Sequence, residues 1–102
     1  MNLITYVNNL EQLEICKEAG LKQIILEHKN VSRFGKLNTS EFIEISKRAT
    51  DLNIQVALEW DVLMTESEFK AKSDIIIELK YYFQSIRVQD AGAINFAVTK
   101  LD

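Results

Sequence analysis

Proline is absent from this 102-residue chain, and glycine occurs only three times. Flexible linkers between domains are rich in glycine, serine or proline, so the sequence contains no segment of that kind. A chain of this length is also suited to one domain rather than several. We therefore expect residues 1–102 to form a single domain.

Cys16 is the single cysteine. One thiol cannot form a disulfide within the chain, and it cannot supply the cysteine cluster of a zinc or iron–sulfur site. Disulfide frameworks are typical of secreted proteins, so a lone cysteine favours a reducing, cytoplasmic setting. The sequence therefore predicts no metal site built from cysteines, and it leaves the cofactor unknown.

Long apolar runs are also missing. No segment approaches the roughly 20 apolar residues that cross a bilayer, and Met1–Tyr6 lack the basic start and apolar stretch of a signal peptide. The net charge of −3 argues against the strong basic excess of a nucleic-acid-binding surface. These absences predict a chain that does not associate with membranes.

What the sequence contains is an alternation of strand and helix patterns. Short apolar segments at residues 3–7, 23–27, 54–59 and 86–89 are the predicted strands, and a helical pattern follows each one. Apolar strands joined by helices are typical of a parallel sheet that helices cover. We therefore predict an α/β fold of four βα units.

The number of units leaves two architectures open. A (β/α)₈ barrel has eight units and typically ~250 residues, so four units correspond to half a barrel. Residues 1–102 are then the N-terminal part of a longer, TIM-barrel-like protein. The alternative is a small open-sheet domain that is complete in itself.

Several residues mark where the predicted helices begin and end. Asn9 is a favourable N-cap, and Gly20 stands where a helix ends in a left-handed residue. Thr39 or Ser40 begins the second helix, and Asn53 closes it. Residues 65–68, Thr-Glu-Ser-Glu, match a capping box ahead of the third helix.

Polar side chains gather at the carboxyl ends of the predicted strands. They are Glu27, His28, Glu59, Asp61, Gln89 and Asp90. In parallel α/β folds these ends meet at one edge of the sheet, where ligands bind. Carboxylates and an imidazole there could act as acid and base or bind a metal ion. Strand ends are also polar because they meet solvent, and Asp90 is a suitable N-cap for the last helix.

From these positions we predict the site residues. The predicted catalytic residues are Glu59, Asp61 and Asp90, and the predicted substrate-binding residues are Arg33, Arg87, Gln89 and His28. Arg33 belongs to the long polar loop at residues 28–38, where it either holds an anionic substrate or is simply solvated. Tyr6 and Trp60 lie near strand ends and could stack on a ligand, or pack in the core.

Arg87 is unusual because it interrupts an apolar strand. Side chains alternate along a strand, so Arg87 faces away from the helices if Ile86 faces them. An arginine that points into a barrel needs a partner, and Glu59 or Glu27 on neighbouring strands would supply one. Arg87 is then either a structural ion pair or an anchor for a substrate carboxylate or phosphate.

Six short sequence motifs follow one another along the chain. They are Asn9-Leu10-Glu11-Gln12-Leu13, Ala19-Gly20, Val31-Ser32-Arg33-Phe34-Gly35, Thr39-Ser40-Glu41-Phe42, Ala57-Leu58-Glu59-Trp60-Asp61 and Val88-Gln89-Asp90-Ala91-Gly92. In order and spacing they resemble the N-terminal half of the collagenase-like U-thirty-two (U32) peptidase family. Glu59 stands where that family usually has asparagine.

The resemblance implies a TIM-barrel protein that acts on a peptide or an RNA at the carboxyl-end mouth of the barrel. The family includes proteases and proteins that hydroxylate RNA. Its cysteine-containing signature lies further along than this chain extends, so we expect these residues alone to be inactive. The alternative function is a non-catalytic binding or assembly module. In either case a four-stranded sheet has two open edges, which predicts a homo-oligomer.

Overall fold

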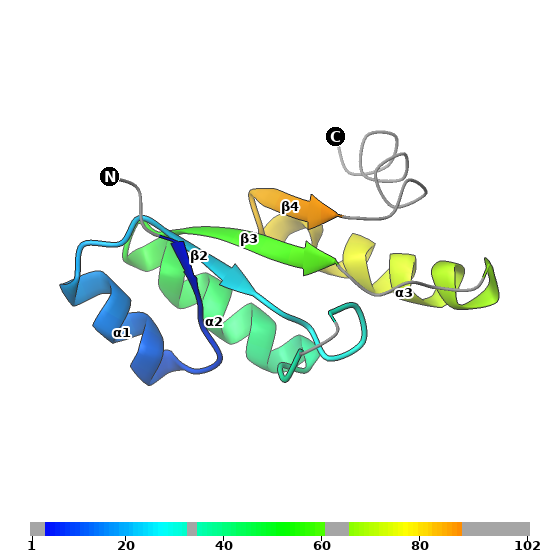
Figure 1. Ribbon diagram of the computed structural model, residues 1–102, viewed down its shortest axis with the longest axis horizontal. Coiled ribbons are helices and arrows are strands. Elements are labelled where there is room, and N and C mark those ends of the chain that lie inside the picture. Colours follow the sequence, from blue (N-terminus) through cyan, green and yellow to red (C-terminus); the bar gives the residue numbers. More distant parts are fainter. Residues whose placement is uncertain (1–3, 33–34, 61–65, 89–102) are drawn as a thin grey trace.

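The computed structural model describes residues 4–32, 35–60 and 66–88, with residues 66–72 and Val88 described by their backbone only (Figure 1). The elements are β1 (Ile4–Tyr6), α1 (Leu10–Glu18), β2 (Gln23–Leu26), α2 (Thr39–Asp51), β3 (Gln55–Trp60), α3 (Glu66–Leu79), the 3₁₀ helix η1 (Lys80–Tyr82) and β4 (Ser85–Val88). This alternation confirms the predicted α/β fold. The helix predicted after the fourth strand lies outside the described residues.

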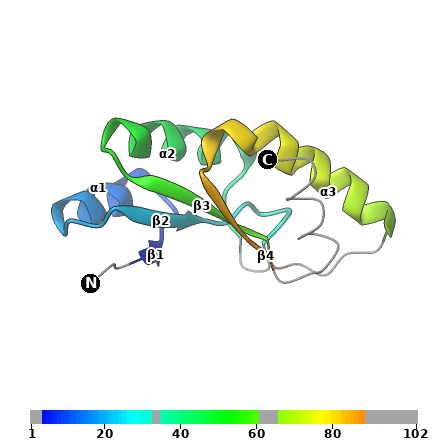
Figure 2. The same ribbon diagram turned by 90° about the horizontal axis from the view of Figure 1, so that it is seen from above.

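The four strands form one parallel sheet in the order β1-β2-β3-β4. Each strand lies beside the next one in the sequence, as in a barrel that is built unit by unit. Figure 2 shows α2 and α3 on the same side of this sheet. In a closed barrel the opposite side would face the interior.

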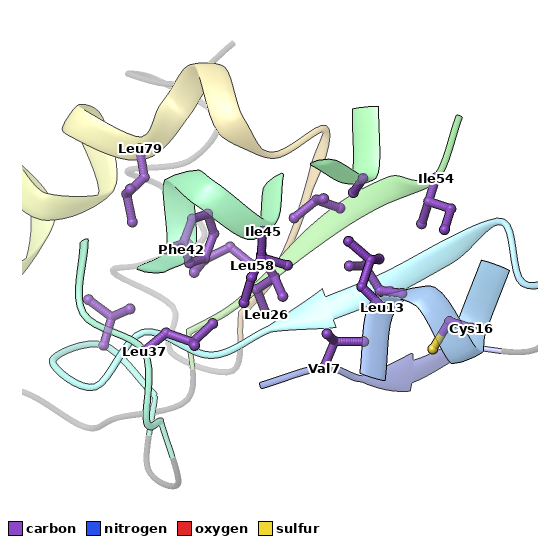
Figure 3. Packing of buried hydrophobic residues seen from close by; sticks show 14 of the residues in the cluster. Val7, Leu13, Cys16, Leu26, Leu37, Phe42, Ile45, Ile54, Leu58 and Leu79 are labelled. Atoms are coloured by element: carbon purple, nitrogen blue, oxygen red, sulfur yellow. The ribbon is translucent and has the colours of Figure 1, made fainter. Parts of the chain in front are cut away.

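The hydrophobic core lies between the sheet and the helices (Figure 3). Phe42 and Ile45 of α2 meet Leu26 of β2 and Leu58 of β3 there, and all four are buried. Burying one such side chain contributes roughly 1.5–3 kcal/mol. Phe42 and Ile45, with Ala49 one turn further on, form a buried apolar stripe that packs α2 on the sheet.

The ends of the helices largely follow the sequence signals. Asn9 caps α1 by accepting a bond from the backbone amide of Gln12, at 2.8 Å. Gly20 (φ +79°) and Asn53 (φ +58°) take the left-handed conformation just beyond α1 and α2. α2 begins at Thr39 as predicted, but its N-cap is Asn38, which forms a full capping box with Glu41.

The described residues of the loop between β2 and α2, on either side of residues 33–34, are more ordered than their polar composition suggests. Val31 and Leu37 are buried in it, and so is Ser32. The amides of Val31 and Ser32 both donate to the carbonyl oxygen of His28. Gly35 packs so closely on that carbonyl that a Cβ at this position would clash with the oxygen. The expectation of a solvated loop is therefore wrong for Ser32, which is buried, whereas Lys36 is exposed and Arg33 lies outside the described residues.

Candidate functional site

The candidate site centres on the carboxylate of Glu59, near the end of β3. The Tyr6 hydroxyl, on β1, donates a hydrogen bond of 2.8 Å to Glu59 Oε2. Two residues 53 positions apart therefore meet across the sheet, on the face away from the helices. This bond to Glu59 raises the pKa of Tyr6, and burial raises it further. The phenol consequently stays protonated at neutral pH and remains a donor.

Arg87 on β4 approaches the same carboxylate oxygen. Its Nη1 atom lies 3.6 Å from Glu59 Oε2, and the two residues are direct neighbours in the strand register. This pairing confirms one of the two partners that the sequence predicts. The prediction of a buried arginine is wrong, since the Arg87 side chain is 54% exposed while that of Glu59 is 5% exposed. The four strands leave this face of the sheet partly open to solvent at β4.

Because Arg87 is exposed and Glu59 is buried, the two side chains are suited to different chemical roles. A carboxylate with 5% exposure has little surface with which to touch a ligand. A guanidinium has five N–H donors in a planar fork, and one nitrogen of Arg87 faces Glu59. The exposed part of this fork can bind an anion or a carbonyl oxygen, and Glu59 holds the fork in place.

The loop after β2 is attached to the same strand end. The Ser32 hydroxyl donates to the backbone carbonyl of Glu59. Ser32 was not among the predicted site residues. The only sequence signal was its place in the loop after a strand, where many folds carry ligand contacts. The bond fixes the loop against β3 next to Glu59.

His28 lies at the end of β2 but does not join this site. Its Nδ1 accepts a bond from the amide of Asn30, at 3.1 Å, and its Nε2 is 3.0 Å from the Thr39 hydroxyl. Nδ1 is therefore unprotonated and Nε2 carries the proton, which it donates to Thr39. Burial, with a smaller effect of Lys29, lowers the pKa of His28. The structure gives this ring a role in joining β2 to the start of α2.

Four predicted site residues lie outside the described residues: Arg33, Asp61, Gln89 and Asp90. Within the described ranges, no group of three or more His, Cys, Asp or Glu side chains is placed to hold a metal ion. Trp60, which we considered as a ligand-stacking residue, is instead buried in the core beneath the helices. Of the predicted site residues, the structure therefore brings together Glu59 and Arg87, and it adds Tyr6 and Ser32.

No helix in the described part of the chain is both long and apolar enough to cross a membrane.

A comparison with protein-family models gives no match, and a comparison with curated proteins gives none either.

Among solved structures, the chain is similar to that of the U32 peptidase Mk0906, with a TM-score of 0.73 and 14% sequence identity. The similarity covers 100% of this chain and 46% of the other, so the chain spans about half the length of that protein. At this identity the likeness shows a shared fold, which is a TIM-barrel-like arrangement of parallel strands and helices.

Proposed function

We propose that this chain is a barrel segment of a peptidase-like protein, and that Tyr6, Glu59 and Arg87 form part of its substrate site. The observation that carries the proposal is the single carboxylate oxygen that both Tyr6 and the half-exposed Arg87 approach. This group lies near the carboxyl ends of parallel strands, where barrel enzymes place their chemistry. The shared fold with a U32 peptidase and the sequence phrases that resemble that family support the same function.

In this proposal Arg87 is the residue that contacts substrate. Its exposed donors would bind a carboxylate of a peptide, because a guanidinium matches a carboxylate in a two-point geometry. Glu59 is a positioning residue that acts through Arg87 and Tyr6. This refines the sequence-based assignment of Glu59 as catalytic, since its burial limits direct contact with a peptide.

Hydrolysis itself would require a carboxylate that reaches water and the scissile bond. We propose Asp61 and Asp90 for this task, as the sequence suggests, with Gln89 and Arg33 as further substrate contacts. One carboxylate would take a proton from water as its oxygen adds to the peptide carbonyl carbon. The C–N bond then breaks, and the leaving amine takes up a proton.

A second candidate function follows from the chemistry of Arg87. Its exposed guanidinium would bind an RNA phosphate as well as a carboxylate, and the resembled family includes proteins that modify RNA. The net charge of −3 disfavours this reading, since RNA binding depends on positive surface charge. We therefore keep the peptide as the first substrate class.

Peptide binding followed by NMR would test the proposal. The probes are a short acetylated alanine peptide with a free carboxyl terminus, the same peptide with an amidated terminus, and a short oligouridylate. We expect the free-carboxylate peptide to shift the resonances of Tyr6 and Arg87, and the amidated peptide to bind at least several-fold more weakly.

Arg87→Met should abolish this binding, and Arg48→Met provides a matched control. Arg48 is also exposed and paired with a glutamate, Glu14, but between α1 and α2. Glu59→Gln should weaken binding, because the variant keeps the Arg87 guanidinium but loses the ion pair that orients it. Preferential binding of oligouridylate would favour the RNA function instead. Equal binding by wild type and Arg87→Met would overturn both.

A further inference from the structure

The sheet is bounded by two strands that each have one neighbour in the described part of the chain. β1 pairs only with β2, and β4 pairs only with β3. An edge strand presents a row of backbone N–H and C=O groups that can pair with another strand. All four strands run in the same direction, so any strand that continues the sheet in barrel fashion must be parallel to them.

The edge at β1 is also apolar and hollowed. A groove of about 490 Å³ lies beside it, lined by Ile4, Thr5, Tyr6, Gln12, Ile15, Cys16, Ala19 and Leu21. Ile4, Tyr6 and Ile15 are each roughly half exposed, at 49%, 46% and 59%. Ile4 and Tyr6 face the side of the sheet away from the helices, whereas Ile15 belongs to α1, so exposed apolar side chains occur on both the strand and the helix layer at this edge.

We propose that a second copy of this chain occupies this edge, and that two copies close one eight-stranded barrel around a two-fold axis. β4 of each copy would pair with β1 of the other, so that the symmetry covers all four open edges together. Rotation about the barrel axis preserves strand direction, as a parallel barrel requires. The structure with the shared fold is about twice as long as this chain, so two copies match its size. This inference rests on the fold and not on the proposed peptide site.

The strand register predicts which residues would meet. Tyr6, Ile25, Ala57 and Ser85 form one row across the sheet. A barrel of this type has a shear of about eight residues, and two-fold symmetry divides it into about four for each copy. With that shift, Ser85 of one copy lies beside the position four residues before Tyr6 of the other copy. Arg87, two residues after Ser85, then lies beside Ile4. A shift in the opposite direction would pair Ser85 with a residue of α1, which is a helix and not a strand.

The closed barrel would also complete the candidate site. A second β1 beside Arg87 would bring the apolar side chain of Ile4 against the guanidinium, which is now 54% exposed. The two Glu59–Arg87 pairs would then face one shared mouth. Each copy would therefore contribute one wall of the site of the other.

Sedimentation equilibrium of the wild-type chain is the first test. We expect a species of twice the 11.8 kDa of one copy at micromolar concentration. Ile15→Glu and Ile4→Lys each place a charge in the groove at an already exposed position, so they should weaken dimerisation at least tenfold while circular dichroism stays unchanged. Thr50→Glu, on the exposed side of α2, is the matched control and should remain dimeric.

Cysteine cross-linking tests the predicted register. In a Cys16→Ala background, Ile4→Cys combined with Arg87→Cys should form a covalent dimer on oxidation, because neighbouring strands lie about 4.8 Å apart. Within one copy these positions are separated by two intervening strands and cannot join. Ile4→Cys with Asp74→Cys should stay monomeric in denaturing gels. A wild-type monomer, an open series of oligomers, or absence of the Ile4–Arg87 cross-link would overturn the proposal, and a monomer would leave the edge to further strands of a longer chain.

Discussion

Within the described residues, two arginines form ion pairs with glutamate, and only one of the two glutamates is buried. Arg48 and Glu14 are both about half exposed, at 46% and 47%, whereas Arg87 pairs with a carboxylate that is 5% exposed. Water screens the first pair from both sides, so it contributes little to stability. The second pair compensates a desolvated carboxylate and should contribute more.

Arg87→Met is therefore expected to lower the free energy of unfolding by about 1–2 kcal/mol. This lies between the roughly 0–1 kcal/mol of an exposed pair and the about 3–5 kcal/mol of a fully buried one. Tyr6 still donates to Glu59 in the variant, which limits the loss. Urea unfolding of Arg87→Met, Glu59→Leu and the double variant would measure the coupling.

Arg48→Met serves as the reference in the same experiment and should change stability by about 0.5 kcal/mol or less. Additive effects of Arg87→Met and Glu59→Leu would show that the two side chains do not stabilise one another. Equal losses for the two arginines would lead to the same conclusion.

His28 should make the stability of the fold depend on pH. Its pKa is lowered from the ordinary 6.5 in the folded chain, so the unfolded chain binds a proton more readily. Above pH 6.5 both states are neutral and stability is unaffected. As the pH falls below 6.5 towards the folded pKa, stability should decrease by up to about 1.4 kcal/mol per pH unit.

The chain has one histidine, so a single imidazole NMR signal reports its titration directly. His28→Asn removes the titrating group and keeps an acceptor near the Asn30 amide. The variant should be less stable at pH 7.5 but should lose the pH dependence that His28 causes below pH 6.5. A His28 signal that titrates at or above pH 6.5 would contradict the expectation.

Among the secondary structure elements, α2 has the most complete set of end signals. Asn38 and Glu41 satisfy each other's backbone amides at its start, at 2.8 and 3.0 Å, and Thr39 in its first turn binds His28. The same helix carries Phe42 and Ile45 into the core. Weakening its start should therefore affect the whole domain.

Asn38→Ala should lower the free energy of unfolding by about 1 kcal/mol, a typical value for loss of an N-cap. Asn38→Ser should recover most of the loss, since serine also accepts a bond from the helix amide. Asn30→Ala, at an exposed asparagine in the same loop, is the control. Thermal unfolding would show whether Asn38→Ala is distinguishable from this control.

Local signals were sufficient to predict these elements but not the loop that joins them. The apolar spacing of α2 and the left-handed Gly20 and Asn53 follow from neighbouring residues in the sequence. The order of the loop depends instead on Ser32 reaching the end of β3 and on Gly35 lying against the His28 carbonyl. No local rule specifies such contacts, which arise only when the chain has folded.

For the whole molecule, the same distinction separates the parts of the site. The alternation of side chains along each strand was sufficient to suggest that Glu59 and Arg87 face the same side of the sheet. Because β3 and β4 are adjacent, the two side chains then lie side by side. Tyr6 was not identified as a partner, because its hydroxyl crosses from β1 to β3. The exposure of Arg87 was also missed, since alternation gives the direction of a side chain but not what covers it.

The purified chain is expected to show no turnover of gelatin or casein. Barrel enzymes draw their catalytic groups from several strands around the ring. Two copies of this chain would repeat the residues of its own βα units and would not supply those of the remaining half of the U32 peptidase with the same fold. Fluorescent gelatin and casein assays would measure this. Turnover that Glu59→Gln abolishes would instead show that these residues suffice for catalysis.

The hydrogen bonds of the loop between β2 and α2 determine how fast this part of the molecule can open. Across the base of the loop, the Lys29 amide donates to the Leu37 carbonyl oxygen, and the Leu37 amide donates to that of Glu27. The amides of Val31 and Ser32 both donate to the His28 carbonyl oxygen. Such amides exchange with deuterium only when the surrounding structure opens. They should therefore exchange as slowly as amides of β2, so that the described parts of the loop do not act as a rapidly moving lid and a ligand meets a surface already formed there.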